Sequence, residues 1–557
     1  MLRNTLDQNV CVQLLTLLVV AVAPIAAASA EEHSLSLELE VLERDLASAD
    51  YQAVLKTMIP TDLAAEWQRV ATRDNYQLFA RQQGGLQAVE RQPALKAAYD
   101  RRRRIATEFL AQMRSAYEAK KLKPPFEDAA VLSRVLDSGA KGEAKSAAAA
   151  TLIELVMPCL GAEQQWPCFR GPTGQGIVLD TDIPLKWSDS ENVQWRFKLP
   201  GRGNSSPVVW GDKLLVTAES QPRPDDAPLR AKDDAPDRLL LCFSTAGRLL
   251  WQHTAPRPET HEVLYWKNTL ASATPVTDGE RVIAFFGNAG LVCCDMDGKR
   301  QWHVDLGEFT TTHGPASAPV LYQNLVILIQ DQNKGRSLCA AFDKRSGAQV
   351  WQRERASSMG WSNPVVLKIG GRDELIFNGS NEVVAYEPLT GEELWKHAGT
   401  SIESIPMIAP GGGLLFSTSG RNGPIFALRP ASPGKATEPE LAWRREHGGP
   451  HVPSPAYIDG RLYLINDTGI AMCLDAATGE TLWQKRLRGK FSTSPLVVGD
   501  KLLATSEEGI TYILQAGPRF ELLGENSLSE TIYATPAVVN GRLYFRSTTG
   551  LICVGGR

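Results

Sequence analysis

The chain has 557 residues and a formal net charge of −4, with 63 Asp and Glu against 59 Lys and Arg. This balance excludes a protein that binds nucleic acid through a basic surface, because such proteins carry an excess of positive charge. Nine cysteines are scattered along the chain without the spacing that a metal site requires.

Residues 1–30 have the pattern of a secretory signal peptide. Arg3 precedes an apolar stretch from Val10 to Val22, and small residues end the segment before Glu31. Cys11 comes before the apolar stretch, so it is badly placed to carry a lipid anchor. The stretch is also too short to predict a permanent transmembrane helix. We therefore expect a soluble, monomeric mature chain in a bacterial periplasm or outside the cell.

Residues 31–137 predict a small helical domain, because apolar residues recur at three- and four-residue spacing from Leu35 to Ala49. This region contains no catalytic constellation. Residues 138–162 predict a linker followed by a short apolar helix. Cys159 and Cys168 flank the junction with the next domain, where a disulfide between them would clamp the two parts together. The alternative is that both remain free thiols.

Residues 163–557 contain eight copies of one repeat, each opening with a proline that begins an apolar strand. The first interval between these prolines is 68 residues, and the later ones are 40–49 residues. A period of this length with four short strands per unit is typical of β-propeller blades. The sequence therefore predicts an all-β, eight-bladed propeller preceded by a small all-α region. The repeat prolines are Pro207, Pro275, Pro319, Pro364, Pro406, Pro455, Pro495 and Pro536.

The long first interval is attributed to an insertion between about Glu219 and Arg238, which is rich in Pro and Asp and typical of a surface loop. Six other cysteines fall on expected third strands, where a small apolar residue would serve. These are Cys242, Cys293, Cys294, Cys339, Cys473 and Cys553.

Most copies end in an outer strand with a tryptophan, which we interpret as a packing anchor between blades rather than a ligand contact. The eighth copy stops at Arg557 without an outer strand. The missing strand stands upstream at residues 192–197, so we predict that this segment closes the ring and removes its exposed strand edges. The blade tryptophans are Trp195, Trp251, Trp302, Trp351, Trp395, Trp443 and Trp483, with Leu523 in the seventh copy.

The repeat resembles that of the pyrroloquinoline quinone (PQQ) propellers. Residues 473–483, with the turn Asp475 to Gly479 before Leu482 and Trp483, carry the likeness most clearly. The opening of the domain, from Trp166 to Pro172, looks like the start of PQQ-like propeller proteins that are abundant in planctomycete-type bacteria. Those proteins resemble the outer-membrane assembly propeller BamB. Enzymes and scaffolds share this repeat, so the resemblance implies the fold more strongly than an activity.

In the enzymes of that family, the resemblance implies PQQ and a calcium ion above the central channel. The calcium is held by oxygens of Glu, Asn and Asp, and a separate Asp acts as the base. Glu403 with Asn268 or Asn363 could supply calcium oxygens here, but no Asp partner or base is evident. The adjacent pair Cys293-Cys294 is interpreted as two strand residues rather than as the disulfide that caps the ring in the alcohol dehydrogenases.

Eight loops precede the repeat prolines and should converge at one end of the channel, where loops on a rigid scaffold commonly carry function. Their side chains either bind a ligand or simply fill and solvate the mouth of the channel, and the sequence leaves both open. These candidates are Arg202, Asn204, Asn268, His313, Trp361, Asn363, Glu403, His451, Phe491 and Tyr533.

The leading hypothesis from the sequence is a non-catalytic propeller that acts as a binding or assembly scaffold in the cell envelope. Its expected partners are envelope proteins or a saccharide, and no cofactor is expected. The alternative is a PQQ- and calcium-dependent dehydrogenase of an alcohol or a sugar. A cluster of Glu, Asn and Asp oxygens at calcium distance would favour the enzyme.

Overall fold

The computed structural model describes residues 165–178, 183–222, 235–260, 262, 264–334, 337–356, 359–369, 372–431 and 438–555. The chain divides into two compact units, Met1–Glu163 and Gln164–Arg557, and every described residue belongs to the second. The predicted signal peptide, the predicted helical domain and the predicted linker therefore lie outside the described residues. None of the described helices is long and apolar enough to span a membrane.

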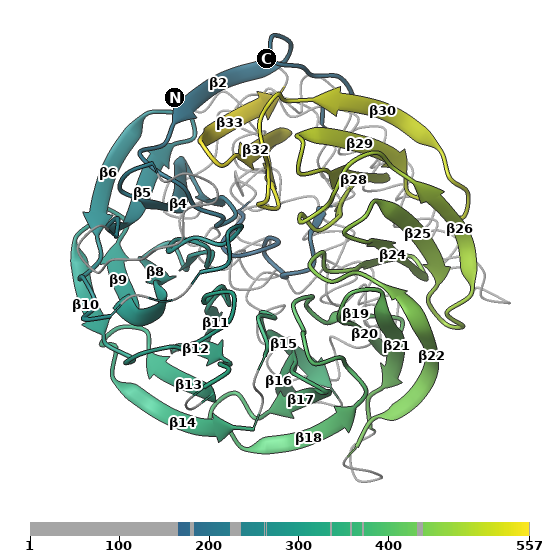
Figure 1. Ribbon diagram of the computed structural model, residues 1–557, viewed down its shortest axis with the longest axis horizontal. Coiled ribbons are helices and arrows are strands. Elements are labelled where there is room, and N and C mark those ends of the chain that lie inside the picture. The colour runs from purple at the N-terminus through teal and green to yellow at the C-terminus, as the bar shows by residue number, and fades with distance from the viewer. Residues whose placement is uncertain are drawn as a thin grey trace, which may run out of the picture. The chain divides into compact units, whose positions relative to one another are not determined.

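The described residues form eight sheets arranged as the blades of a ring (Figure 1), each with four antiparallel strands and one with a fifth strand paired in parallel at its inner edge. This confirms the predicted eight-bladed propeller. Blades 1 to 4 are β3 (Val208–Trp210), β4 (Lys213–Glu219), β5 (Arg238–Ser244) and β6 (Leu249–Thr254); β7 (Val276–Thr277), β8 (Arg281–Phe285), β9 (Leu291–Asp295) and β10 (Arg300–Val304); β11 (Val320–Tyr322), β12 (Leu325–Gln330), β13 (Ser337–Asp343) and β14 (Gln349–Arg355); β15 (Val365–Ile369), β16 (Arg372–Asn378), β17 (Glu382–Tyr386) and β18 (Glu393–Ala398).

In blade 2, a short 3-10 helix, Gly287–Ala289, lies between β8 and β9. Blades 5 to 8 follow the same order of strands. The strands are β19 (Ala409–Gly411), β20 (Leu414–Thr418), β21 (Gly423–Arg429) and β22 (Glu440–Gly449); β23 (Ala456–Ile458), β24 (Arg461–Ile465), β25 (Ile470–Asp475) and β26 (Thr481–Arg486); β27 (Leu496–Val498), β28 (Lys501–Thr505), β29 (Ile510–Gln515) and β30 (Leu522–Ser527); β31 (Ala537–Val539), β32 (Arg542–Arg546), β33 (Gly550–Gly555) and β2 (Val193–Lys198).

Position within a blade decides how apolar each strand is. The second and third strands lie between neighbouring blades, so both of their faces are buried, as in β12, where every residue is buried. The outermost strands meet solvent on one side, and β26 buries Trp483 while its other residues are exposed. This difference explains why the middle strands read as continuous apolar runs and the outer ones do not.

In most blades the tryptophan of the outer strand forms a hydrogen bond to the following blade. Trp443 donates its indole N–H to the carbonyl oxygen of Ala476 at 2.9 Å, and its ring lies against Gly479 in the same turn. Five further blade tryptophans, Trp195, Trp251, Trp302, Trp351 and Trp483, donate in the same way to the turn of the next blade, at 2.9–3.1 Å. Trp395 differs, because its N–H donates to Glu374 Oε2 at 2.6 Å. Their interpretation as packing anchors agrees with these contacts.

The residue before each repeat proline joins neighbouring blades at the channel wall. The backbone N–H of Ser454 donates to Ser494 Oγ at 2.9 Å, and that of Ser494 donates to Thr535 Oγ1 at 2.9 Å. Ser206 N–H reaches Thr274 Oγ1 in the same way, also at 2.9 Å. At Asn363 a side-chain amide oxygen takes the same role and accepts the Ala318 N–H at 2.6 Å, so a side-chain oxygen can satisfy this backbone donor.

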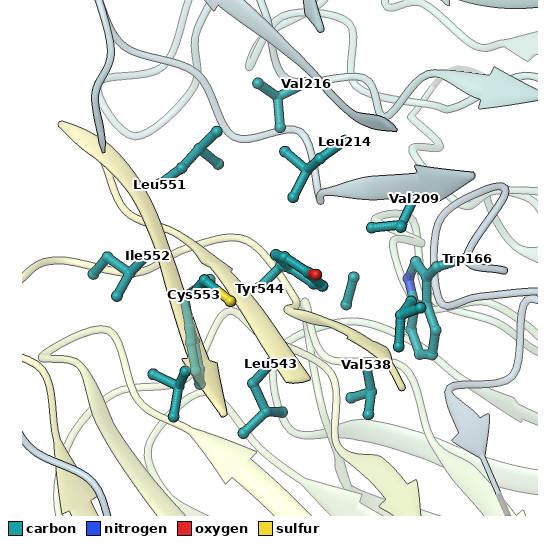
Figure 2. Close-up of a cluster of buried hydrophobic side chains, with 14 of the residues drawn as sticks. Trp166, Val209, Leu214, Val216, Val538, Leu543, Tyr544, Leu551, Ile552 and Cys553 are labelled. Carbon is teal, nitrogen blue, oxygen red and sulfur yellow. The ribbon is translucent and has the colours of Figure 1, made fainter. Parts of the chain in front are cut away.

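The segment that stands upstream in the sequence closes the ring, as predicted. β2 pairs antiparallel with β33, with Trp195 opposite Cys553, and so completes blade 8. The indole N–H of Trp195 then donates to Thr245 O of blade 1 at 2.9 Å. Leu543, Tyr544 and Ile552 of blade 8 pack with Val209 and other residues of blade 1 in one buried cluster (Figure 2). Hydrogen bonds and buried side chains thus join blade 8 to blade 1.

The segment Gln165–Val178, here called the axial segment, was not predicted to enter the ring. Trp166 exchanges backbone hydrogen bonds with Val209 of blade 1, at 2.8 and 2.9 Å. β1 (Ile177–Val178) pairs in parallel with β27 of blade 7, and Arg170 donates to Pro455 O of blade 6 at 2.7 Å. The segment therefore crosses the centre of the ring (Figure 1).

Candidate functional site

The first strand of every blade runs from one end of the channel to the other, and this fixes which loops share an end. The loops before the first strands lie at the end here called the mouth. The axial segment contacts the first strands nearer their far ends, where Gly499 N–H donates to Val178 O at 2.7 Å. The predicted binding loops and the axial segment are therefore at opposite ends of the channel.

The longest loop at the mouth joins β6 to β7, and its central part is here called the mouth segment, Tyr265–Asn268. Asn204 donates to the carbonyl oxygen of Lys267 at 2.7 Å, and Arg202 donates to that of Trp266 at 3.3 Å. The Asn268 amide donates to His313 O of the next loop at 2.6 Å. Three of the predicted residues thus hold the backbone of one loop in a fixed position.

An ion pair ties the mouth segment to blade 7. Lys267 Nζ lies 2.7 and 2.8 Å from the two carboxylate oxygens of Glu507, and Ser492 Oγ donates to Glu507 Oε1 at 2.6 Å. The same ammonium lies 5.4 Å from the ring centre of Tyr533 and 5.3 Å from that of Trp266. The mouth segment follows blade 1 in the chain. Through Lys267 it contacts Glu507 of blade 7 and lies near Tyr533 in the loop before blade 8, and through Asn268 it contacts the loop before blade 3.

His313 stands between two aromatic rings. Its ring meets that of Tyr265 edge to face at 5.1 Å and that of Trp361 at 5.2 Å. Burial lowers the pKa of His313 below its ordinary value; the negative charge of Glu403 opposes this shift, and the positive charges of His451 and Arg421 add to it. The imidazole is consequently neutral near pH 7.

Glu403 and His451 form a polar pair between the loops of blades 5 and 6. His451 Nε2 lies 3.0 Å from Glu403 Oε2. The backbone N–H of His451 donates to Asp467 Oδ2 at 2.7 Å, which fixes the loop that carries the imidazole. Arg421 Nε lies 3.7 Å from the same Glu403 oxygen, and the Arg421 side chain is 71% exposed.

Four residues of the predicted set are engaged within the protein. Phe491 is fully buried and packs near Tyr512, with ring centres 6.4 Å apart. Arg202 and Trp361 are also buried. Asn363 accepts the backbone N–H of Ala318 at 2.6 Å and takes part in the hydrogen bonds between blades. Ligand contact stays a prediction for the whole set.

The oxygens proposed for calcium are engaged within the protein. Asn268 Oδ1 accepts the Thr269 N–H at 2.9 Å, Asn363 Oδ1 accepts the Ala318 N–H, and Glu403 pairs with His451. Among the described residues, no group of three or more His, Cys, Asp or Glu could hold a metal ion. Each of these three side chains thus has a hydrogen-bond partner within the protein.

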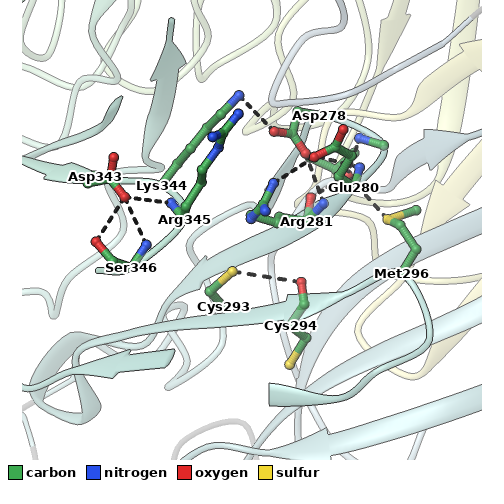
Figure 3. Close-up of polar contacts among 12 residues, drawn as sticks. Asp278, Glu280, Arg281, Cys293, Cys294, Met296, Asp343, Lys344, Arg345 and Ser346 are labelled. Atoms are coloured by element: carbon green, nitrogen blue, oxygen red, sulfur yellow. Dashed lines mark hydrogen bonds and ion pairs between the residues drawn. The ribbon is translucent and has the colours of Figure 1, made fainter. Parts of the chain in front are cut away.

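The adjacent cysteines of β9 belong to the core. Cys293 packs in the buried cluster that blade 2 shares with blade 3, whereas Cys294 packs in the cluster shared with blade 1. Figure 3 shows the two thiols on different sides of the strand. Both are free thiols, and burial raises the pKa of each to about 12. The interpretation as strand residues agrees with this placement, because adjacent residues of a strand face opposite ways.

The thiol of Cys168 is free, and its Sγ donates to Gly171 O at 2.9 Å. Burial raises the pKa of this thiol to about 12. Cys159 lies outside the described residues, so their pairing stays a prediction.

Sequence reasoning missed Tyr265, Trp266, Lys267, Arg421 and Glu507 at the mouth. One signal was present, since the first interval between repeat prolines is 68 residues. The extra length of this interval over the later ones was assigned to an insertion within blade 1, although part of it is the long connection from β6 to β7. Arg421 and Glu507 lie on turns between second and third strands, which share the mouth end but were not considered.

The described part of the chain is thus an eight-bladed propeller with an axial segment at one end and an aromatic mouth at the other. A family model described as outer membrane protein assembly factor BamB matches residues 236–422 and 435–516. The outer membrane protein assembly factor BamB of Legionella pneumophila (strain Paris) is 23% identical over 240 residues, which are 42% of this chain. The match spans 50% of that curated relative.

Solved structures of two dehydrogenases share the architecture. The quinohemoprotein alcohol dehydrogenase from Comamonas testosteroni has a TM-score of 0.53 and 14% identity, over 71% of this chain and 81% of that chain. A europium-containing methanol dehydrogenase has a TM-score of 0.51 and 12% identity, over 70% and 90%. At such identities the likeness shows the fold alone. Within the residues that the family model matches, the chain is similar to BamB, and its described part is a β-propeller with PQQ-like repeats.

Proposed function

We propose that this protein is an exported, non-catalytic scaffold of the cell envelope that binds another protein through the mouth of its propeller. The likeness to a relative named as an outer membrane protein assembly factor supports a role in assembly. The signal-peptide pattern of residues 1–30 supports export to the periplasm or beyond.

The observation that carries the proposal is the exposed aromatic pair of the mouth segment. Tyr265 and Trp266 are 41% and 45% exposed, although large aromatic side chains are usually packed away. Hydrogen bonds from Asn204 and Arg202 hold the backbone beneath them. Aromatic side chains on a rigid loop bind partners with little loss of conformational entropy.

A quinone dehydrogenase is the alternative, and the fold alone does not separate the two. The proposal is favoured because Asn268, Asn363 and Glu403 direct their oxygens to protein donors. A calcium ion would need those same oxygens. We therefore propose that the protein acts without PQQ or a metal ion.

Site-specific photocrosslinking in the native envelope tests the proposed function. A photoreactive amino acid replaces Trp266 at the mouth, and a control replaces Leu482, an exposed residue of the outer strand β26. The proposal predicts one recurring protein adduct from position 266 and none of that mass from position 482. Adducts from both positions alike, or none from the mouth, would contradict it.

A further inference from the structure

We propose that the mouth recognises a segment of its protein partner that presents a carboxylate next to a large apolar side chain. This inference rests on the proposed function and names the chemistry of the partner. Three features carry it: an exposed apolar surface, a cation beside it that is available to an incoming anion, and the internal use of the other polar groups.

The apolar surface consists of Tyr265, Trp266 and Ile402, which are 41%, 45% and 55% exposed. Among the described residues, Tyr265 and Trp266 are the only large aromatic side chains this exposed. Most of the other exposed large apolar residues occur singly on outer strands of different blades: Leu249, Val350, Leu441, Leu482 and Leu522. Scattered single residues need no partner, whereas an exposed pair of adjacent aromatic side chains indicates one.

Contacts between rings make the aromatic surface continuous with the charged one. Tyr265 contacts Trp266 with ring centres 5.6 Å apart and meets His313 at 5.1 Å. His313 in turn meets Trp361 at 5.2 Å, and the backbone N–H of Trp361 donates to Ser404 O, the residue after Glu403, at 2.8 Å. Ile402 precedes Glu403 in the chain, so the exposed apolar side chain of blade 5 lies on the loop that carries this carboxylate.

Lys267 and Arg421, two of the cations on the loops and turns of the mouth, differ in their availability. Lys267 is neutralised by Glu507 at 2.7 Å. Arg421 lies 3.7 Å from Glu403, which is beyond hydrogen-bond distance, and Glu403 has His451 at 3.0 Å. The exposed Arg421 guanidinium therefore keeps its planar pair of donors for an incoming carboxylate, which it can bind through two parallel hydrogen bonds.

The hydrogen bonds already formed within the mouth favour a protein segment over a saccharide as its ligand. Recognition of sugar hydroxyls requires several open donors and acceptors, but the side chains of Asn204 and Asn268 are bound to loop carbonyl oxygens. Glu403 is paired with His451. The aromatic surface and the Arg421 guanidinium remain open, and Trp, Tyr and Arg are the residues that dominate protein–protein hot spots.

Binding of fluorescent synthetic peptides to the full-length mature protein tests the inference. The peptide set varies two adjacent positions, one carrying Asp or Asn and the other Leu or Ser. The protein variants are Trp266→Ala and Arg421→Ala. The matched controls are Leu482→Ala, an exposed apolar residue on an outer strand, and Arg488→Ala, an arginine whose side chain is 75% exposed.

We expect the Asp-Leu peptides to bind, and their affinity to fall about tenfold or more with either mouth variant and to stay within twofold with either control. Changing Asp to Asn in the peptide should cost as much as Arg421→Ala, and the two changes together should cost no more than one, because they remove the same contact. Equal affinity for Asp and Asn peptides would overturn the inference.

Two further outcomes separate this inference from the proposed function. A partner that crosslinks at position 266 but binds unchanged to Arg421→Ala would refute the carboxylate and leave the scaffold in place. Binding of a neutral oligosaccharide probe that Trp266→Ala abolishes, with no peptide bound, would replace the protein segment by a saccharide. Absence of any protein adduct at the mouth would remove both proposals.

Discussion

Alanine at Gly479 should destabilise the propeller more than alanine at Gly460, although both glycines lie in turns of blade 6. Their backbone φ angles are +77° and +74°, so each substitution pays the same penalty for a left-handed conformation, about 1–2 kcal/mol. The two positions differ in their surroundings. A Cβ at Gly479 would lie 2.6 Å from the Trp443 ring, whereas one at Gly460 would meet nothing within 4 Å.

The additional cost at Gly479 follows from the clasp between blades 5 and 6. Trp443 must move away from the new methyl group, and overpacking of this kind costs about 1–3 kcal/mol. Its N–H bond to Ala476 O at 2.9 Å would then be strained or lost, at about 1 kcal/mol. We therefore expect Gly479→Ala to lower the free energy of unfolding by about 2–4 kcal/mol more than Gly460→Ala does.

Urea unfolding followed by far-UV circular dichroism measures the difference, because a lower midpoint at constant slope reports lost stability. A double-mutant cycle identifies the cause. In a Trp443→Ala background, Gly479→Ala should cost no more than Gly460→Ala, since the ring that the methyl group would meet is gone. Equal losses at the two glycines in the parent protein would refute the clasp.

Three other predictions concern the ring, one carboxylate and the buried thiols. A chain that begins at Leu199 lacks β2 and should fail to give the cooperative unfolding transition of a chain that begins at residue 163. Burial raises the pKa of Asp278, but its contact with Lys344 at 2.8 Å and the turn amides lower the pKa more, so it falls below its ordinary value of 3.8 (Figure 3). A carboxylate whose pKa is lowered on folding stabilises the fold at a pH above its ordinary pKa and loses this contribution in acid. Asp278→Asn should therefore lower the free energy of unfolding by about 1–2 kcal/mol at pH 7 and by progressively less as the pH falls below 3.8. Unfolding curves of the parent and the variant at each pH measure this difference. Cys293 and Cys294 should resist iodoacetamide at pH 8 in the folded protein and react after unfolding, and intact-mass measurement should show no disulfide between them.

The propeller could be predicted because each blade repeats the same physical requirement. A hairpin turn such as Asp459-Gly460, the apolar middle strands and the tryptophan of the outer strand recur at one period. The eighth copy lacks its outer strand, which identified residues 192–197 as the strand that completes it. The structure also explains the cysteines. Cys473 and Cys553 stand directly opposite Trp483 and Trp195, where the large ring leaves room for only a small apolar neighbour.

The convergence of the loops before the repeat prolines could be predicted, but their contacts and the path of the axial segment could not, because no period governs them. Arg170 bonds to Pro455, and Lys267 bonds to Glu507. Such contacts depend on loop paths that appear only after the ring has closed. The burial of Phe491 was likewise not evident from its place before a repeat proline.

Calorimetric titration of the purified mature protein with PQQ in the presence of calcium tests the central claim most directly, followed by dye-linked oxidation of an alcohol and sugar panel. The account predicts no heat of binding and no turnover, because the oxygens of Asn268, Asn363 and Glu403 are held by protein donors. Stoichiometric binding of PQQ with oxidation of any substrate would contradict the scaffold and make the mouth an active site.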